Sequence, residues 1–267
     1  MTGGLPNDEA ETPLAGGMGS GGSVVRVGNT VRRPYREHTP SVHAFLEHLE
    51  QVGFGGAPRA LGRDERGREG VSWMAGDVGV PPFPDWVAGE ELLVSVAELE
   101  AELHRAARSF IPPAGAVWDS ANLPPAEPGA LVCHNDLCVE NVVVDGGRAV
   151  GFIDFDFTAP SDRLVDIAIA ARHWIPVRDG RDIDDARREL DQVARWRCLV
   201  DAHGLSEDER GAVAAHLGGY LDRALVSMEQ RARSGNELYR RMWDSGYAEQ
   251  NRRSSAWLER HAVELRR

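Results

Sequence analysis

His134-Asn135-Asp136-Leu137-Cys138-Val139-Glu140-Asn141 is the stretch of this 267-residue chain that decides its fold. A second acidic segment, Phe152-Ile153-Asp154-Phe155-Asp156, follows it. Short apolar runs at Leu131–Cys133, Val142–Val144 and Ala149–Ile153 predict strands that flank these two segments. The polar side chains therefore lie on a tight loop and at the end of a neighbouring strand.

The side chains of Asp136, Asn141 and Asp154 match the needs of phosphoryl transfer. That reaction needs a carboxylate that orients a hydroxyl and accepts its proton, and oxygen ligands that hold magnesium on the nucleotide. The spacing H-x-D-x4-N, followed by a strand-borne aspartate, is typical of protein kinases. A protein kinase itself is disfavoured, because the D-F-G and A-P-E elements are missing.

The motif instead resembles the aminoglycoside phosphotransferase family of small-molecule kinases. The resemblance includes Gly151-Phe152-Ile153-Asp154-Phe155-Asp156 and Asp162-x3-Asp166-Ile167-Ala168, and it covers most of the chain. It implies an α+β, bilobal protein-kinase-like fold with a small β-rich N-lobe and a larger, mainly helical C-lobe. It also implies a nucleotide, ATP or GTP, as phosphoryl donor, Mg²⁺ as cofactor and a small hydroxylated molecule as acceptor.

The resemblance assigns roles to individual residues. Asp136 is implied as the catalytic base, and Asn141 and Asp154 as magnesium ligands. His134 is implied as a scaffold residue whose imidazole braces the catalytic loop. Asp166 is expected to brace the same loop from the first turn of a helix, where the helix dipole favours a carboxylate.

Asp156 has three open interpretations. It lies two residues beyond Asp154, so strand alternation would direct both side chains to the same face. It could support the metal, contact the substrate or accept hydrogen bonds from the backbone.

Outward from the motif, the chain divides into four segments. Residues 1–12 are polar and aperiodic, which predicts a disordered N-terminus. Residues 13–76 form the predicted N-lobe, with a nucleotide loop, a hairpin and one helix. Residues 77–89 contain several prolines and predict a linker, and residues 90–267 form the predicted C-lobe.

Local patterns place the secondary structure within these segments. β-Branched runs on both sides of Gly28-Asn29 predict a hairpin, and Thr39-Pro40 starts a helix that ends at Gly53. A further helix is predicted from Glu90 to Phe110. From Ser161 onward the chain is predicted to be helical, with breaks near Pro176–Gly180, Gly204 and Ser234-Gly235.

The glycine-rich segment before the hairpin contains a G-x-G-x-x-G pattern in Gly17, Gly19, Ser20 and Gly22. No helix follows it, so it is not a dinucleotide-binding fingerprint. Its position ahead of the hairpin indicates a loop over the nucleotide phosphates. A flexible linker is the alternative.

The chain contains no lysine, so the nucleotide-contacting lysine of the family is absent. Arg33 is the first choice for its replacement and Arg32 the second, because Val31 and Arg33 share one strand face. Val42 or His43 stands where helix register would place the partner glutamate. A degenerate pseudokinase that binds a small ligand or a partner without transfer therefore remains an alternative.

The C-terminal helices offer acids among aromatic residues, and Glu237, Asp244 and Glu249 are candidate contacts for an amine-bearing acceptor such as an aminoglycoside. An amphipathic helix pair with ordinary surface acids is the alternative. The sequence leaves open the acceptor, the choice between ATP and GTP, and the oligomeric state.

Composition narrows the class of protein further. A formal net charge of −12 argues against nucleic acid as a partner. No apolar run is long enough to span a membrane, and three cysteines without metal-type spacing predict reduced thiols and a cytoplasmic location.

Overall fold

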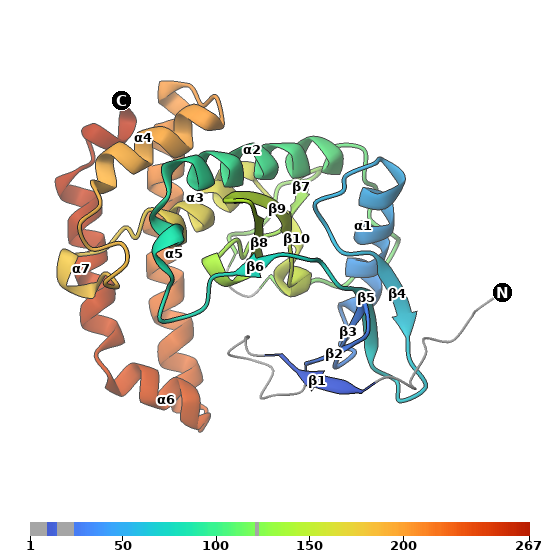
Figure 1. The fold of residues 1–267 in the computed structure, drawn as a ribbon. Coiled ribbons are helices and arrows are strands. Elements are labelled where there is room, and N and C mark those ends of the chain that lie inside the picture. The colour runs from blue at the N-terminus through green and yellow to red at the C-terminus, as the bar shows by residue number, and fades with distance from the viewer. Residues whose placement is uncertain (1–9, 15–23, 121–122) are drawn as a thin grey trace.

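The computed structural model describes residues 10–14, 24–120 and 123–267. Antiparallel strands and one helix make up its N-terminal part, and helices dominate the C-terminal part, from α2 across the top to α5 and α7 on the left (Figure 1). This arrangement confirms the predicted fold class.

A five-stranded antiparallel sheet forms the N-terminal part, in the order β1-β2-β3-β5-β4. Its strands and its helix are β1 (Glu11–Pro13), β2 (Val25–Val27), β3 (Thr30–Arg33), α1 (Thr39–Gln51), β4 (Ala60–Arg63) and β5 (Glu69–Ser72). The predicted hairpin is present as β2 and β3, and Gly28 supplies the positive φ of 56° that its two-residue turn requires. Helix α1 carries Pro40 in its first turn, where proline is tolerated.

The predicted disordered terminus needs a correction at its end. Glu11 and Thr12 belong to strand β1, which pairs with β2. The carboxylate of Glu11 lies 2.7 Å from Arg66 Nη1 and 2.9 Å from Arg68 Nη2. Contacts with residues far away in the sequence therefore order this strand, which local composition could not indicate. Residues 1–9 and 15–23, including the predicted glycine loop with Gly17, Gly19, Ser20 and Gly22, lie outside the described part of the chain.

The C-terminal part combines short strands with long helices. Its strands are β6 (Asp77–Val78), β7 (Leu131–Cys133), β8 (Val142–Asp145), β9 (Arg148–Phe152) and β10 (Ala159–Ser161). They form a β6-β8-β9 sheet and a β10-β7 pair. Its helices are α2 (Glu90–Ala107), α3 (Arg163–Trp174), α4 (Gln192–Ala202), α5 (Glu207–Arg233), α6 (Glu237–Asp244) and α7 (Tyr247–Arg260). The predicted breaks between helices are observed.

One apolar core connects the two parts. Phe45 and Leu49 of α1, Leu93 of α2, and Phe152 and Trp174 nearer the catalytic loop are fully buried members of the same cluster. Because this core fixes α1 and α2 against the loops that follow β7 and β9, those loops have a rigid support. Among the described helices, none is both long and apolar enough to cross a membrane.

Candidate active site

The loop between β7 and β8 carries Asp136 and Asn141, which are bonded to each other. Asn141 Nδ2 donates to the backbone oxygen of Asp136 at 2.8 Å and to its Oδ2 at 2.9 Å. A short 3-10 turn, Val139–Asn141, brings the asparagine back to the aspartate. The amide nitrogen therefore orients the carboxylate, and the amide oxygen of Asn141 is left as a potential metal ligand.

Asp166 holds this loop from below. It is fully buried in the first turn of α3, and its carboxylate accepts the backbone N–H of Asn135 at 2.7 Å and of His134 at 3.3 Å. Asn135 adopts a left-handed backbone with φ of 61°, which asparagine tolerates better than most residues. The bracing role expected for Asp166 thus has two hydrogen bonds to support it.

His134 lies beneath the loop rather than in the site. Its Nε2 is 3.0 Å from the backbone oxygen of Ile153, and its ring lies 4.5 Å from that of Phe155. Burial lowers the pKa of His134, against the attraction of Asp166. The imidazole therefore links the catalytic loop to the segment that carries Asp154, as a scaffold residue would.

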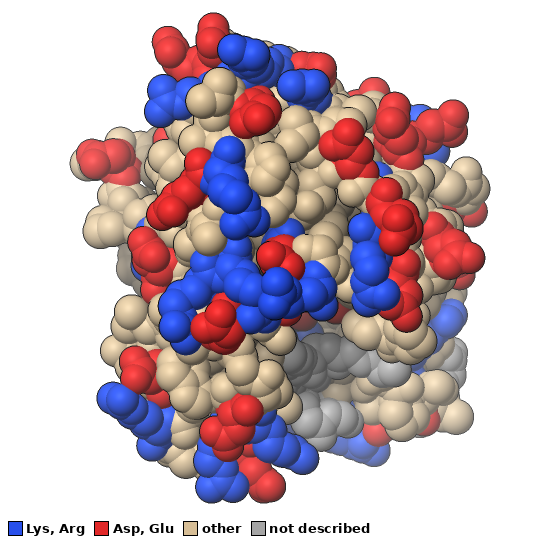
Figure 2. Space-filling view, turned by 90° about the vertical axis from the view of Figure 1, so that its left-hand side faces the viewer, with Lys and Arg blue, Asp and Glu red and all other residues tan. Residues whose placement is uncertain are grey.

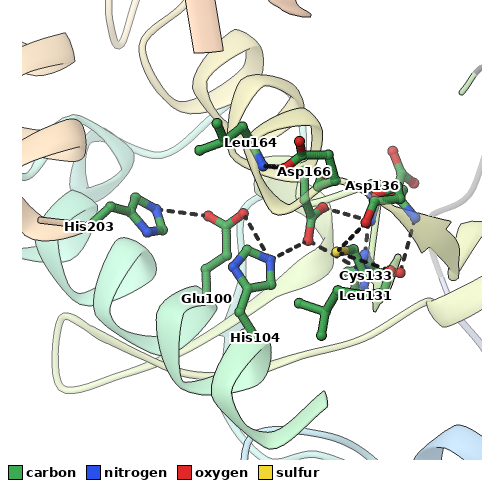
Figure 3. A network of polar contacts seen from close by, with 12 residues as sticks. Glu100, His104, Leu131, Cys133, Asp136, Leu164, Asp166 and His203 are labelled. Atoms are coloured by element: carbon green, nitrogen blue, oxygen red, sulfur yellow. Dashed lines mark hydrogen bonds and ion pairs between the residues drawn. The ribbon is translucent and has the colours of Figure 1, made fainter. Parts of the chain in front are cut away.

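A chain of buried polar residues continues from Asp166 to the far side of α2 (Figure 3). His104 Nε2 lies 2.9 Å from Asp166 Oδ2 and 4.0 Å from Glu100, and Glu100 lies 3.2 Å from His203 Nε2. Burial alone would lower the pKa of His104, but the hydrogen bond and charge of Asp166 raise it. Sequence reasoning missed this chain. Its only local signal is the i, i+4 spacing of Glu100 and His104 on α2.

Asp154 and Asp156 converge on a single arginine of the N-terminal sheet. Arg33 Nη1 lies 2.9 Å from Asp154 Oδ1 and 2.9 Å from Asp156 Oδ1. The reason is not strand alternation, because β9 ends at Phe152. Asp154 adopts a left-handed conformation with φ of 62°, and a 3-10 turn, Phe155–Phe157, follows. The turn brings both carboxylates to the same cation.

Arg33 also has the acidic partner that sequence register did not provide. Arg33 and Glu69 face each other across β3 and β5, and Arg33 Nε lies 2.5 Å from Glu69 Oε2. His43 of α1 lies 2.8 Å from the other oxygen of Glu69. Burial alone would raise the pKa of Glu69, but His43 and Arg33 lower it, so the carboxylate stays charged. In place of the lysine on a strand and the glutamate on a helix that the resemblance implies, this chain has an interaction among Arg33, Glu69 and His43.

Arg32 has a different environment. Its side chain is fully buried on the opposite face of β3, and its Nε is 3.7 Å from Asp64. Strand alternation therefore separates the two arginines as expected, and only Arg33 reaches the aspartates.

Asp136 faces a small cavity. The residues around this cavity are Asp119, Leu123, Asn135, Asp136, Phe157, Ile169 and Tyr220. Burial, and then the charge of Asp154, raise the pKa of Asp136 to about 8. In its ionised form Asp136 is therefore a stronger base than an ordinary aspartate.

The acids expected to bind an amine do not surround this cavity. Glu237, Asp244 and Glu249 are exposed on α6 and α7. Glu249 lies 2.9 Å from Arg252 and 3.5 Å from Arg253. The structure thus brings together Asp136, Asn141, Asp154, Asp156 and Arg33, and leaves the three helix acids apart from them.

A two-lobed fold with this loop at its junction defines a class, the kinase-like phosphotransferases. The family model described as "Phosphotransferase enzyme family" matches residues 116–199, a range that contains Asp136, Asn141 and Asp154. The Trifolitoxin immunity protein of Rhizobium leguminosarum bv. trifolii is 32% identical over 213 residues, or 76% of each chain. The chain belongs to the phosphotransferase enzyme family, and its enzyme class is that of the small-molecule kinases.

Solved structures share the fold at low sequence identity. A choline/ethanolamine kinase family protein from Mesorhizobium loti superimposes with a TM-score of 0.62 at 17% identity, over 97% of this chain and 93% of the other. The GDP complex of aminoglycoside 2'-phosphotransferase-IIIa has a TM-score of 0.60 at 13% identity, over 93% of each chain. Both likenesses agree with the predicted bilobal, kinase-like architecture.

Proposed function

We propose that this protein transfers the γ-phosphoryl group of ATP or GTP to a hydroxyl of a small molecule, with Mg²⁺ as cofactor. The proposal rests on one observation. Four side chains come together at the junction of the two lobes: Asp136, Asn141, Asp154 and Arg33. Each of these side chains supplies one requirement of phosphoryl transfer.

Asp136 orients the acceptor hydroxyl and takes its proton. Its carboxylate is held by Asn141 at 2.9 Å and faces the small cavity, which is the proposed acceptor cavity. The loop cannot shift easily, because Asp166 binds its backbone at Asn135 and His134. Precise placement of the reacting hydroxyl is a large part of the rate enhancement in such reactions.

Asn141 and Asp154 would hold the metal. A carboxylate and an amide oxygen form the hard-oxygen donor set that Mg²⁺ prefers, and the Asp154 side chain is 41% exposed toward solvent. Mg²⁺ supplies charge neutralisation on the nucleotide phosphates when it is bound.

Arg33 contacts the nucleotide phosphates in place of lysine. Glu69 and His43 position its guanidinium next to Asp154 and Asp156. The pseudokinase alternative rested on the absent lysine and on a missing acidic partner. Arg33 supplies a cation in place of the lysine, and Glu69 of a neighbouring strand is its acidic partner. The Arg33–Glu69 pair therefore supports catalysis over binding alone.

The chemical class of the acceptor is a separate part of the proposal. The relative named for immunity to trifolitoxin supports a toxic compound with a free hydroxyl as acceptor, whose phosphorylation would protect the cell. An amine-bearing acceptor stays a prediction from the acids of α6 and α7.

Thermal unfolding with ATP or GTP tests the proposal without knowledge of the acceptor. A nucleotide at about one hundred times its dissociation constant stabilises the fold by about 2.7 kcal/mol, and we expect this shift to disappear in EDTA. Asp154→Ala should abolish the Mg²⁺-dependent shift, whereas Asp136→Asn should retain it and lose turnover. Asp244→Asn is the control, because it removes the same negative charge at an exposed residue. No Mg²⁺-dependent shift with either nucleotide would refute the proposal.

A further inference from the structure

An arginine side chain lies next to Tyr220, a residue that lines the acceptor cavity. Ile169 of α3 and Tyr220 of α5 line the cavity together with Asp136. Arg172 follows Ile169 by one turn of α3 and therefore lies on the same side of that helix. Its guanidinium carbon is 6.0 Å from the centroid of the Tyr220 ring. Tyr220 thus lines the same cavity as Asp136 and also lies next to Arg172.

One guanidinium nitrogen of Arg172 is buried without a hydrogen-bond partner among the described residues. The residue is 9% exposed, and its Nη1 is buried with no hydrogen-bond acceptor in the described part of the chain. Arg178 lies just beyond the end of α3. Its Nε is also buried and has no hydrogen-bond acceptor in the described part of the chain. No carboxylate among the described residues forms an ion pair with either side chain. Burial of a cation without an acceptor is costly, so folding alone gives no reason for these two residues.

The surroundings of the two arginines carry excess positive charge. Arg187, which lies near them, is already paired with Asp184 Oδ2 at 2.6 Å and donates to the backbone oxygen of His173. Burial, and then the charges of Arg172 and Arg187, lower the pKa of Arg178 to about 10. Burial and the same arginines keep the pKa of His173 well below its usual value. Arg172, Arg178 and Arg187 therefore influence one another, and Asp184 only partly offsets their charge at Arg178.

Several exposed arginines have acidic partners. Figure 2 shows basic side chains gathered near the middle of one face of the molecule, with acidic ones among them. Arg253 lies 2.6 Å from Asp182, and Arg181 lies 2.9 Å from Asp179. Arg253 and Arg181 have partners within the chain, whereas Arg172 Nη1 and Arg178 Nε have none in the described part.

We propose that the acceptor carries an oxyanion, a carboxylate or a phosphate group, which Arg172 and Arg178 bind while the acceptor hydroxyl lies at Asp136. The inference rests on the proposed function, because it concerns the acceptor of that reaction. The planar guanidinium matches both oxyanions with paired hydrogen bonds. Binding would supply the missing acceptors and neutralise the local excess of positive charge. A polycationic acceptor would instead meet like charge at Arg172.

The test measures thermal unfolding in chloride, acetate and phosphate at one pH and equal ionic strength, without nucleotide or metal. Arg172→Met keeps the length of the side chain and removes its charge. Arg252→Met removes a charge from an exposed arginine that pairs with Glu249, and is the matched control. Comparison of variants within each salt cancels general salt effects on stability and phosphate binding elsewhere, such as at Arg33.

We expect acetate, phosphate or both to raise the Tm of the wild type and of Arg252→Met by about 3 °C or more relative to Arg172→Met, as for a ligand at about ten times its dissociation constant. A response to acetate alone identifies a carboxylate site, and a response to phosphate alone a phosphate site. Equal shifts in all three proteins would overturn the proposal. If Arg172→Met does not fold, Arg178→Met, at a partly exposed residue, is compared in the same way.

A turnover assay then separates acceptor classes. With Mg²⁺ and nucleotide, ω-hydroxy acids are compared with amino alcohols of equal chain length. We expect kcat/KM to favour the acids by at least about tenfold in the wild type, and to lose that preference in Arg172→Met. Preference for amino alcohols would overturn the proposal and support the amine-bearing acceptor. Because the salt experiment uses no nucleotide, its failure is distinct from failure of the proposed function.

Discussion

Replacement of Asp166 by asparagine is the sharpest test of how the catalytic loop is held. The carboxylate accepts three hydrogen bonds in a fully buried position, from the backbone of Asn135 and of His134 and from His104. Asparagine has the same shape, but one carboxylate oxygen is replaced by an amide nitrogen. This nitrogen is itself a donor and cannot accept hydrogen bonds from the surrounding N–H groups. At least one backbone N–H or the imidazole is then left without an acceptor, at about 1–3 kcal/mol each, and the charge that balances His104 is lost.

We therefore expect Asp166→Asn to lower the free energy of unfolding by about 3–5 kcal/mol. For a chain of this size that corresponds to a decrease in Tm of roughly 10 °C. Displacement of the loop by about 1 Å would also lower kcat by about 100-fold. Chemical denaturation and an acceptor-coupled assay measure the two effects.

Asp162→Asn is the matched control for this prediction. Asp162 is exposed, and its side chain caps α3 by accepting the N–H of Leu164 at 2.9 Å. Asparagine caps helices about as well as aspartate, so a loss below about 0.5 kcal/mol is expected. If the two variants melt within about 2 °C of each other, the buried charge of Asp166 does not hold the loop, and the reasoning is refuted.

Further predictions concern the other buried charges. The folded state raises the pKa of His104 above 6.5, so its pairing with Asp166 stabilises fully below that pH and is lost as the pH rises through the folded-state pKa. Urea unfolding from pH 6 to 9 should show that the free energy of unfolding declines in the wild type but not in His104→Gln. Parallel curves for the two proteins would show that the His104–Asp166 pair is not the cause of the pH dependence. Glu69→Gln should weaken nucleotide binding by about tenfold, since Arg33 loses a charged partner; unchanged affinity in calorimetry would remove Glu69 from the site. Arg33→Met should abolish the nucleotide-dependent Tm shift, whereas Arg32→Met should change only the baseline Tm, and the reverse pattern would exchange their roles.

Local sequence was sufficient for the catalytic loop and the main elements. His134 to Asn141 must form a tight loop because apolar strands precede and follow it, and the Gly28-Asn29 pair can only be a turn between β-branched runs. The resemblance carried by these residues then led to the fold class, because one loop motif is tied to one architecture. Spacing along the chain encodes such features directly.

Tertiary structure alone decided which charges meet. Glu69 reaches Arg33 through the register of β3 and β5, and Asp154 reaches it through a left-handed residue after β9. Glu100 of α2 contacts His203, which follows α4, and Arg172 Nη1 has no hydrogen-bond partner among the described residues. A carboxylate has the same local signature whether it is solvated on a surface or paired in the interior. Only the packing of distant elements determines its solvation, its partners and therefore its pKa.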